Sequence, residues 1–211
     1  NDGCLERTFF RFQGVTCSVN PRIGREGDLE IRLAARSKKV CVIGGGPAGM
    51  EAARVCALRG HSVTLYEKRK LGGRLNEASV PHFKADLRPF VKYLITQIGK
   101  LGIKVIEKEA TIEEIKNGGY DVVIVAVGAI PTKPLVPGIE RPMVVDALDV
   151  LNQSVTVGQK VVIIGGGLVG IEVAIYLAEQ GKEVTIVSRR DEIMEDVESG
   201  TKEVYKGWIA E

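Results

Sequence analysis

The sequence predicts an α/β protein with parallel strands, built from two copies of one strand–turn–helix–strand unit. The first observation is a repeat: an apolar run, three glycines and a helical pattern occur twice, and the offset of 121 between Gly44 and Gly165 also separates Glu67 from Ser188. The second is composition, because 25 glycines and 5% aromatic residues beside many Val, Ile and Ala are typical of buried parallel strands joined by turns.

The first copy begins with an apolar, β-rich run at residues 39–43, which predicts a strand. Residues 48–58 predict a helix, and Gly60 is expected to end it in left-handed geometry. A second strand is predicted at residues 63–67. This order puts the glycines between strand and helix, which is where such units bind a dinucleotide pyrophosphate.

Each spaced glycine of the first copy has its own expected role. Gly44 permits the tight turn, Gly46 lets the backbone approach phosphate, and Gly49 lets the helix pack on the strand. Pro47 and Ala48 open the helix, whose dipole and free N–H groups favour an anion. The alternative is a glycine-rich turn that binds no ligand.

The second copy repeats this order, with a strand at residues 160–164, a helix at 169–178 and a strand at 184–188. Gly181 is expected to end its helix. Its turn glycines are Gly165, Gly167 and Gly170. Since duplication at constant spacing is hard to obtain by chance, both copies predict a dinucleotide site. Two such sites in one chain suggest that a hydride passes between two nucleotides.

The residue that ends the second strand of each copy chooses the nucleotide. In the first copy it is Glu67, whose carboxylate accepts hydrogen bonds from a ribose 2′-OH and repels a 2′-phosphate, as FAD or NAD requires. In the second copy it is Ser188, followed by Arg189 and Arg190, and these groups suit the 2′-phosphate of NADP(H). The alternative is two solvated arginines, because Arg69 aligns with Arg190.

Further patterns lie between and after the copies. A helix is predicted at residues 89–101 and a strand at 103–106. After one acid, Asp121, the continuous apolar run to Val127 predicts a buried parallel strand whose C-terminal end meets the nucleotide. Residues 132–142 carry three prolines and predict a linker. After Arg190 the pattern fades into a charged stretch.

Charge and hydropathy exclude several function classes. Lys and Arg number 29 against 27 Asp and Glu, and this balance argues against binding to nucleic acid or an anionic membrane. The longest apolar runs are far shorter than a membrane span, and no signal peptide is visible. A reducing, cytoplasmic location is expected because no disulfide framework is visible.

The four cysteines are of two kinds. Cys41, in the first strand, and Cys56, on the following helix, are expected to be small buried apolar residues. Cys4 and Cys17 precede the first strand and are candidate metal ligands, although two cysteines alone do not make a metal site. The sequence singles out no general acid or base.

At residues 44–49, 67, 72–75, 126–129 and 165–170, the sequence resembles the FAD- and NAD(P)-binding modules of two-dinucleotide-binding flavoprotein oxidoreductases. The N-terminal segment narrows this resemblance. Cys4-Leu5, Val15-Thr16-Cys17-Ser18-Val19-Asn20-Pro21 and Gly24-Arg25-Glu26 are similar to the tail of the [4Fe–4S] segment in NADH:flavin oxidoreductases of the 2,4-dienoyl-CoA reductase and 2-enoate reductase type. Ala78-Ser79-Val80-Pro81 and Phe83-Lys84 are also similar to that family.

The resemblance implies a Rossmann-like three-layer fold with two dinucleotide-binding units, the second one truncated. FAD would contact Gly44, Gly46, Pro47, Ala48, Gly49, Glu67, Lys68, Gly73, Arg74, Leu75, Ala126 and Gly128. NADP(H) or NAD(H) would contact Gly165, Gly167, Gly170, Ser188, Arg189 and Arg190. The implied domains are an iron–sulfur remnant and linker at residues 1–37, an FAD-binding domain at 38–150 and the start of an NAD(P)-binding domain at 151–211.

In that family an FMN-carrying TIM barrel lies upstream, and four cysteines ligate the [4Fe–4S] cluster. Cys4 and Cys17 match two of these ligands. The implied activity of the parent enzyme is a relay, from NADPH through FAD, the cluster and FMN to an activated C=C bond. The substrate class would be a small enoate or enoyl-CoA, bound in the barrel.

Two other functions stay open. One is a barrel-less NAD(P)H-dependent electron-transfer flavoprotein similar to a glutamate-synthase small subunit or a ferredoxin reductase. The spacing of Cys4 and Cys17 counts against the first of these relatives, which packs its cysteines in short C-x-x-C repeats. The other is a non-catalytic module that binds a nucleotide only as structural support.

Overall fold

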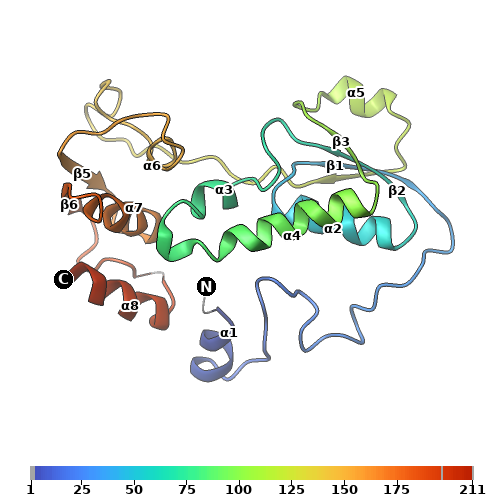
Figure 1. Ribbon diagram of the computed structural model, residues 1–211, viewed down its shortest axis with the longest axis horizontal. Coiled ribbons are helices and arrows are strands. Elements are labelled where there is room, and N and C mark those ends of the chain that lie inside the picture. The colour runs from blue at the N-terminus through green and yellow to red at the C-terminus, as the bar shows by residue number, and fades with distance from the viewer. Residues whose placement is uncertain (1–2, 196, 211) are drawn as a thin grey trace. The chain divides into compact units, whose positions relative to one another are not determined.

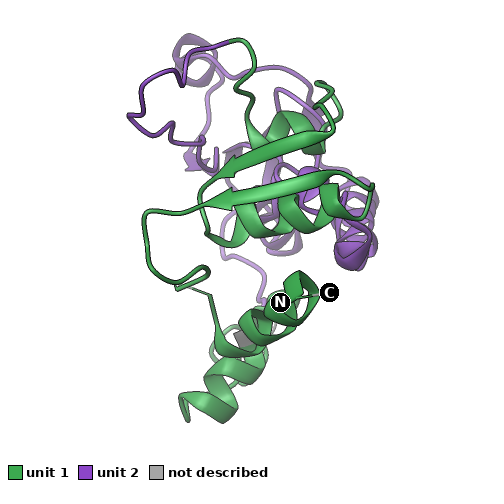
Figure 2. Cartoon of the chain, turned by 90° about the vertical axis from the view of Figure 1, so that its left-hand side faces the viewer, with its two compact units in different colours: residues 1–30, 142–211 green, residues 31–141 purple. Residues whose placement is uncertain are grey.

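The computed structural model describes residues 3–195 and 197–210 of the chain. They divide into two compact units, one within residues 31–141 and the other within residues 1–30 and 142–211 (Figure 2). Figure 1 labels the helices and strands. The domain boundaries expected after residues 37 and 150 remain predictions.

The unit of residues 31–141 is built on a four-stranded parallel sheet with the order β3-β2-β1-β4. Its strands are β1 (Lys39–Ile43), β2 (Ser62–Tyr66), β3 (Lys104–Ile106) and β4 (Val122–Val125). Its helices are α2 (Pro47–Leu58), α3 (Leu75–Ala78), the 3₁₀ turn η2 (His82–Lys84), α4 (Leu87–Lys100) and α5 (Ile112–Asn117). The predicted α/β class and parallel sheet are therefore confirmed.

Local sequence explains where helix α2 begins and ends. Proline is compatible with the first helical position because its missing N–H has no intrahelical partner there, and Pro47 occupies that position. At the other end Gly60 adopts a φ of 84°, and the N–H of His61 bonds the carbonyl of Cys56. This left-handed glycine ends the helix as the sequence predicted.

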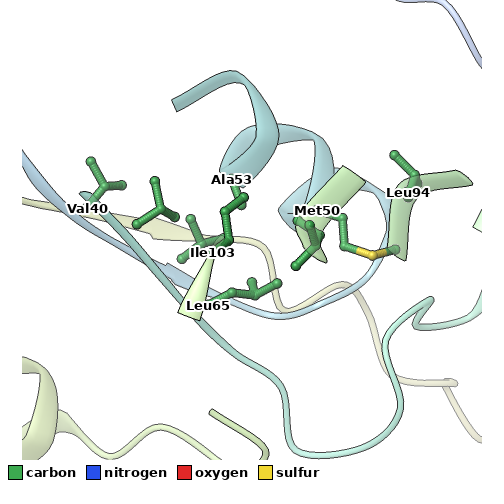
Figure 3. Packing of buried hydrophobic residues seen from close by; sticks show 9 residues of the cluster. Val40, Met50, Ala53, Leu65, Leu94 and Ile103 are labelled. Atoms are coloured by element: carbon green, nitrogen blue, oxygen red, sulfur yellow. The ribbon is translucent and has the colours of Figure 1, made fainter. Parts of the chain in front are cut away.

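The hydrophobic core of this unit lies between the sheet and helices α2 and α4. Figure 3 shows the side chains of Met50, Leu65 and Leu94, from α2, β2 and α4, in this cluster. Helix α4 contributes Leu94 and Ile98, one helical turn apart, so that one stripe of the helix is buried. Burying each such side chain stabilises the fold by about 1.5–3 kcal/mol.

Strand β4 departs from the prediction of a fully buried strand. It is an edge strand, paired only with β1, and the Val123 and Val125 side chains are 42% and 68% exposed. The alternate residues Val122 and Ile124 pack against the core. The run is apolar on both faces, but the face that carries Val123 and Val125 remains exposed.

The other unit contains a two-stranded parallel sheet of β5 (Lys160–Ile164) and β6 (Glu183–Val187). Its helices are α1 (Gly3–Leu5), the π-helical turn η1 (Glu6–Phe10), α6 (Ala147–Leu151), α7 (Leu168–Ala178) and α8 (Ser199–Ala210). Helix α7 packs on the sheet, and the side chains of Val162, Ile164 and Val187 alternate on the exposed face. Within the described residues, no helix is both long and apolar enough to cross a lipid bilayer.

Candidate nucleotide sites

The glycine turn between β1 and α2 is held in a form that side chains would disrupt. Gly44 has a φ of 105°, and a Cβ added there would overlap the carbonyl oxygen of Ala126. A Cβ at Gly49 would overlap the carbonyl oxygen of Gly44, so this glycine permits the close contact of helix and strand. These observations agree with the roles expected of the first and third glycines.

The middle glycine borders open space. A Cβ built on Gly46 would meet no heavy atom closer than 3.9 Å, the Cα of Gly73. Gly46 is also the N-cap of α2, and no side chain caps the helix there. The N-terminus of α2 therefore offers backbone N–H groups and the positive end of the helix dipole to an anion. This cradle fits a pyrophosphate.

Glu67 lies directly beside the cradle, at the end of β2. Its Oε2 accepts a hydrogen bond of 2.6 Å from the N–H of Gly45, and its Oε1 accepts one of 2.8 Å from the N–H of Arg69. The residue is only 9% exposed, and these charge-assisted bonds compensate for its burial. Each oxygen keeps a further lone pair for a ribose hydroxyl.

The loop that contains Gly72 and Gly73 packs against the same glycine turn. The N–H of Gly72 bonds the carbonyl of Gly45 at 2.9 Å, and a Cβ on Gly73 would lie 2.8 Å from the Cα of Gly46. Both loop glycines have positive φ, 112° and 53°. The loop therefore brings Gly73 beside the predicted phosphate cradle, with Arg74 and Leu75 immediately after it in the chain.

Sequence reasoning missed Glu77, a carboxylate that organises this loop. Its side chain is 2% exposed, and its Oε1 lies 2.7 Å from Nη1 of Arg69 and 3.5 Å from Nη1 of Arg74. Burial raises the pKa of Glu77, but the hydrogen bond from Arg69 and the charge of Arg74 more than offset this, so the pKa lies below its ordinary value. The Arg74-x-x-Glu77 spacing was the available signal.

The end of β4 completes the first site. The N–H of Ala126 bonds the carbonyl of Ile43 at 2.8 Å, which carries the ladder up to the glycine turn. Gly128 follows with a φ of 71°. The structure thus brings Ala126 beside Gly44, and a role of this strand end in nucleotide binding remains a prediction. Lys68, also assigned to this site, forms an ion pair of 2.9 Å with Glu109.

The second glycine turn has the same construction. Gly165 has a φ of 123°, and a Cβ on Gly170 would overlap the carbonyl oxygen of Gly165. A Cβ on Gly167 would have no neighbour within 4 Å, and Gly167 is the N-cap of α7, with no side chain capping the helix. The loop after β6 also packs against this turn, because the N–H of Met194 bonds the carbonyl of Gly166 at 2.8 Å. We call the loop that packs back on the glycine turn in each unit the returning loop.

Ser188 takes the place that Glu67 has in the first unit. Its Oγ accepts a hydrogen bond of 3.1 Å from the N–H of Arg190, as Glu67 does from Arg69. The guanidinium of Arg190 pairs with Glu195 at 3.1 Å. Arg189, which lies between Ser188 and Arg190 in the sequence, is exposed. These neutral and cationic groups leave this strand end open to a negatively charged ligand.

The cysteines of the N-terminal segment do not complete a cluster site. Cys4 and Cys17 are half-buried free thiols. Among residues 3–195 and 197–210, no group of three or more His, Cys, Asp or Glu side chains could hold a metal ion. A [4Fe–4S] cluster needs four thiolates, so the described residues do not fit one.

The other two cysteines are structural. Cys41 is fully buried and Cys56 is half-buried against the core. Burial raises the pKa of both thiols. A raised pKa suppresses the thiolate, so neither residue has the character of a reactive cysteine.

Comparison with known proteins places these two units in a family. A family described as pyridine nucleotide-disulphide oxidoreductase matches residues 38–209. The chain belongs to this family. This match confirms the predicted Rossmann-like fold. A family named for pyridine nucleotides also agrees with the presence of two dinucleotide cradles in one chain.

Two similar proteins are much longer than this chain. Cinnamate reductase of Clostridium sporogenes is 45% identical over 92% of this chain and 29% of its own length. NADH oxidase of Thermoanaerobacter brockii is 44% identical over 94% of this chain and 32% of its own. The chain thus spans about a third of these relatives.

A solved structure is also similar to nearly all of this chain, and it too is much longer. A 2-naphthoyl-CoA reductase in complex with 2-naphthoyl-CoA matches with a TM-score of 0.94 and 38% identity, over 99% of this chain and 32% of that one. The resemblance to 2-enoate reductase-type enzymes that the sequence indicated is confirmed by these relatives.

Proposed function

We propose that this chain is the reductase half of an iron–sulfur flavoprotein ene-reductase, which takes hydride from a nicotinamide nucleotide. The observation that carries the proposal is the pair of matching glycine cradles whose strand ends differ, Glu67 in one and Ser188 in the other. When bound, FAD supplies the exchange between a two-electron hydride donor and one-electron acceptors. The protein supplies placement and electrostatics.

The first cradle is assigned to FAD. Backbone N–H groups of Gly46 and Gly49 would hold the pyrophosphate, and Glu67 would accept hydrogen bonds from the ribose hydroxyls. The remaining residues assigned to FAD are Gly44, Pro47, Ala48, Lys68, Gly73, Arg74, Leu75, Ala126 and Gly128. Since a carboxylate repels a 2′-phosphate, Glu67 also keeps NADP(H) out of this site.

The second cradle is assigned to NADP(H), with NAD(H) as the weaker ligand. Gly165, Gly167 and Gly170 would form its pyrophosphate cradle, as their counterparts do in the first unit. Ser188, Arg189 and Arg190 form its strand end, where an uncharged hydroxyl and cations favour a phosphate.

The rest of the proposal concerns the parent protein. In the parent protein, Cys4 and Cys17 would supply two of the four thiolates of a [4Fe–4S] cluster. The FMN barrel is proposed for the part of the relatives that this chain does not span. Two relatives named cinnamate reductase and 2-naphthoyl-CoA reductase support an enoate or an unsaturated CoA ester as substrate. A reducing cytoplasm would suit such a cluster.

The test is a spectrum of the intact protein loaded with FAD, desalted and titrated anaerobically with NADPH or NADH. We expect the flavin to be retained and to bleach faster with NADPH. The matched variant Glu67→Ala should retain less flavin, whereas Glu113→Ala, an exposed change on helix α5, should retain it fully. Loss of all flavin on desalting from the unmodified protein would overturn the FAD assignment.

A further inference from the structure

The returning loop of the first unit continues directly into α3, and helix α4 contacts this segment near both of its ends. At the start, a Cβ added to Gly72 would lie 2.9 Å from a methyl group of Val91 on α4. At the end, the guanidinium of Arg88 on α4 donates two hydrogen bonds. Its Nε bonds the carbonyl of Ser79 at 2.9 Å, and its Nη2 bonds the carbonyl of Val80 at 3.0 Å. The segment is therefore attached to α4 at its start and at its end.

The two carbonyls that Arg88 bonds lie where α3 ends. The last carbonyls of a helix have no N–H group of a following turn as a donor, so another group must supply one. Ser79 is the C-cap of α3 and is only 7% exposed. A guanidinium presents its N–H groups in a fixed planar fork, which allows Arg88 to bond two successive carbonyls at once. These bonds fix the position at which α3 ends.

Side-chain packing supports this contact only in part. A hollow of about 260 Å³ separates part of α3 from α4, and Asn76, Ser79, Val91 and Ile95 are among the residues that line it. Side chains are therefore not close-packed along this part of the contact. The bonds from Arg88, which also borders the hollow, attach the two elements where packing does not. Their loss should allow the end of α3 to move away from α4.

The second unit attaches its own returning loop in a similar way. Helix α8 follows that loop, and the ammonium groups of Lys202 and Lys206 on α8 each lie 3.0 Å from Oε1 of Glu192 in the loop. In each unit, the helix that follows the returning loop thus bonds back to it through cationic side chains. The acceptors differ, since they are backbone carbonyls in one unit and a carboxylate in the other. The attachment itself is what the two units share.

We infer that Arg88 is a positioning residue of the first nucleotide site, which acts by holding the returning loop against the glycine turn. This inference rests on the proposed function, because Gly73, Arg74 and Leu75, which are assigned to FAD, lie between the two attachments. Since Glu67 is assigned to the adenosine ribose, the loop would serve the part of FAD beyond the pyrophosphate. Loss of Arg88 should therefore affect that part of FAD most.

The test is equilibrium binding of FAD and of ADP to the intact protein and its variants. ADP has the adenosine and the pyrophosphate of FAD but lacks the ribityl chain and the flavin. Arg88→Ala should weaken FAD binding by roughly tenfold, the scale of a hydrogen bond to a charged group, and ADP binding by less than about twofold. The absorbance spectrum of the flavin that this variant still binds should shift toward that of free FAD. Arg88→Lys should recover part of the affinity, because an ammonium can bond one of the two carbonyls.

A control on the same helix separates this role from general effects of charge and folding. Lys100→Ala removes an exposed cation from the last turn of α4 and should change neither affinity. The inference fails if Arg88→Ala weakens FAD and ADP by the same factor, as a general loss of folding would, or if it weakens neither. Absence of FAD binding by the unmodified protein would instead overturn the proposed function.

Discussion

The carboxylate of Glu67 accepts a hydrogen bond of 2.6 Å from the backbone N–H of Gly45, the residue inside the glycine turn. The group expected to bind the ribose therefore also fixes the turn expected to bind the pyrophosphate. Removal of this side chain should affect both parts of the site, since it leaves the buried N–H of Gly45 without its acceptor.

Glu67→Ala is expected to weaken FAD binding by roughly tenfold to a hundredfold, because each buried donor left without an acceptor costs about 1–3 kcal/mol. Glu67→Gln should have a smaller effect, since the amide oxygen can still accept one bond. Fluorescence titration with FAD measures both. Equal affinities for the unmodified protein and Glu67→Ala would contradict the assigned role.

Gly44→Ala is expected to destabilise the unit of residues 31–141 by at least about 1–3 kcal/mol, the cost of strained backbone, with the overlap at Ala126 adding to it. Gly99 is the matched control. It lies in helix α4, and an added Cβ would meet nothing within 4 Å. Gly99→Ala should be neutral or stabilise by about 0.5 kcal/mol. Urea unfolding would compare them, and similar losses for both would refute the strain argument.

Glu77→Gln is expected to change how stability depends on pH. Arg69 and Arg74 hold the pKa of Glu77 below its ordinary value. Its contribution to the free energy of unfolding is therefore present above the unfolded pKa, about 4.3, and is lost as the pH falls through the lower folded pKa. Since Arg69 is half-exposed, we expect a loss of about 1–3 kcal/mol at pH 7, less than for a fully buried pair.

The measurement is the difference in unfolding free energy between the unmodified protein and Glu77→Gln, from pH 7 down to pH 3. That difference should shrink on acidification, because protonated Glu77 no longer attracts the arginines. Glu113→Gln, an exposed change on helix α5, should show no such trend. A difference that stays constant with pH would assign the loss to packing instead.

Sequence patterns were sufficient for the features that depend on local spacing. The five-residue strand β1 and the left-handed Gly60 follow from an apolar run and a helix-stopping glycine, and both were predicted. The exposure of Val125 was not, because an all-apolar run has no polar face to mark the edge of a sheet. Helix α8 begins at Ser199, directly after the charged stretch of residues 191–198 and before residues 205–209, where the sequence indicated the start of a further element.

The candidate sites show a similar limit. The glycine turns were predictable because only glycine permits such backbone contacts, so the requirement is visible in the sequence itself. The pairing of Arg190 with Glu195 was not predicted, although the alignment of Arg190 with Arg69 suggested that its charge need not serve a phosphate. The acid that each arginine meets depends on the path of the returning loop, which no short motif encodes.

Ser188→Glu is expected to give the second site the nucleotide preference of the first. A carboxylate there would stand where Glu67 stands in the first unit and could accept bonds from a ribose hydroxyl and from the N–H of Arg190. It would repel a 2′-phosphate and pair with Arg189 in its place. We therefore expect NADP⁺ affinity to fall by roughly tenfold or more, and NAD⁺ affinity to hold or rise.

Ser188→Ala is the matched control, because it removes the hydroxyl without adding charge. It should weaken NADP⁺ by only a fewfold, the scale of one neutral hydrogen bond. Binding isotherms for both nucleotides decide the matter. If Ser188→Glu left the preference for NADP⁺ intact, this strand end would not select the nucleotide, and the difference between Glu67 and Ser188 would need another explanation.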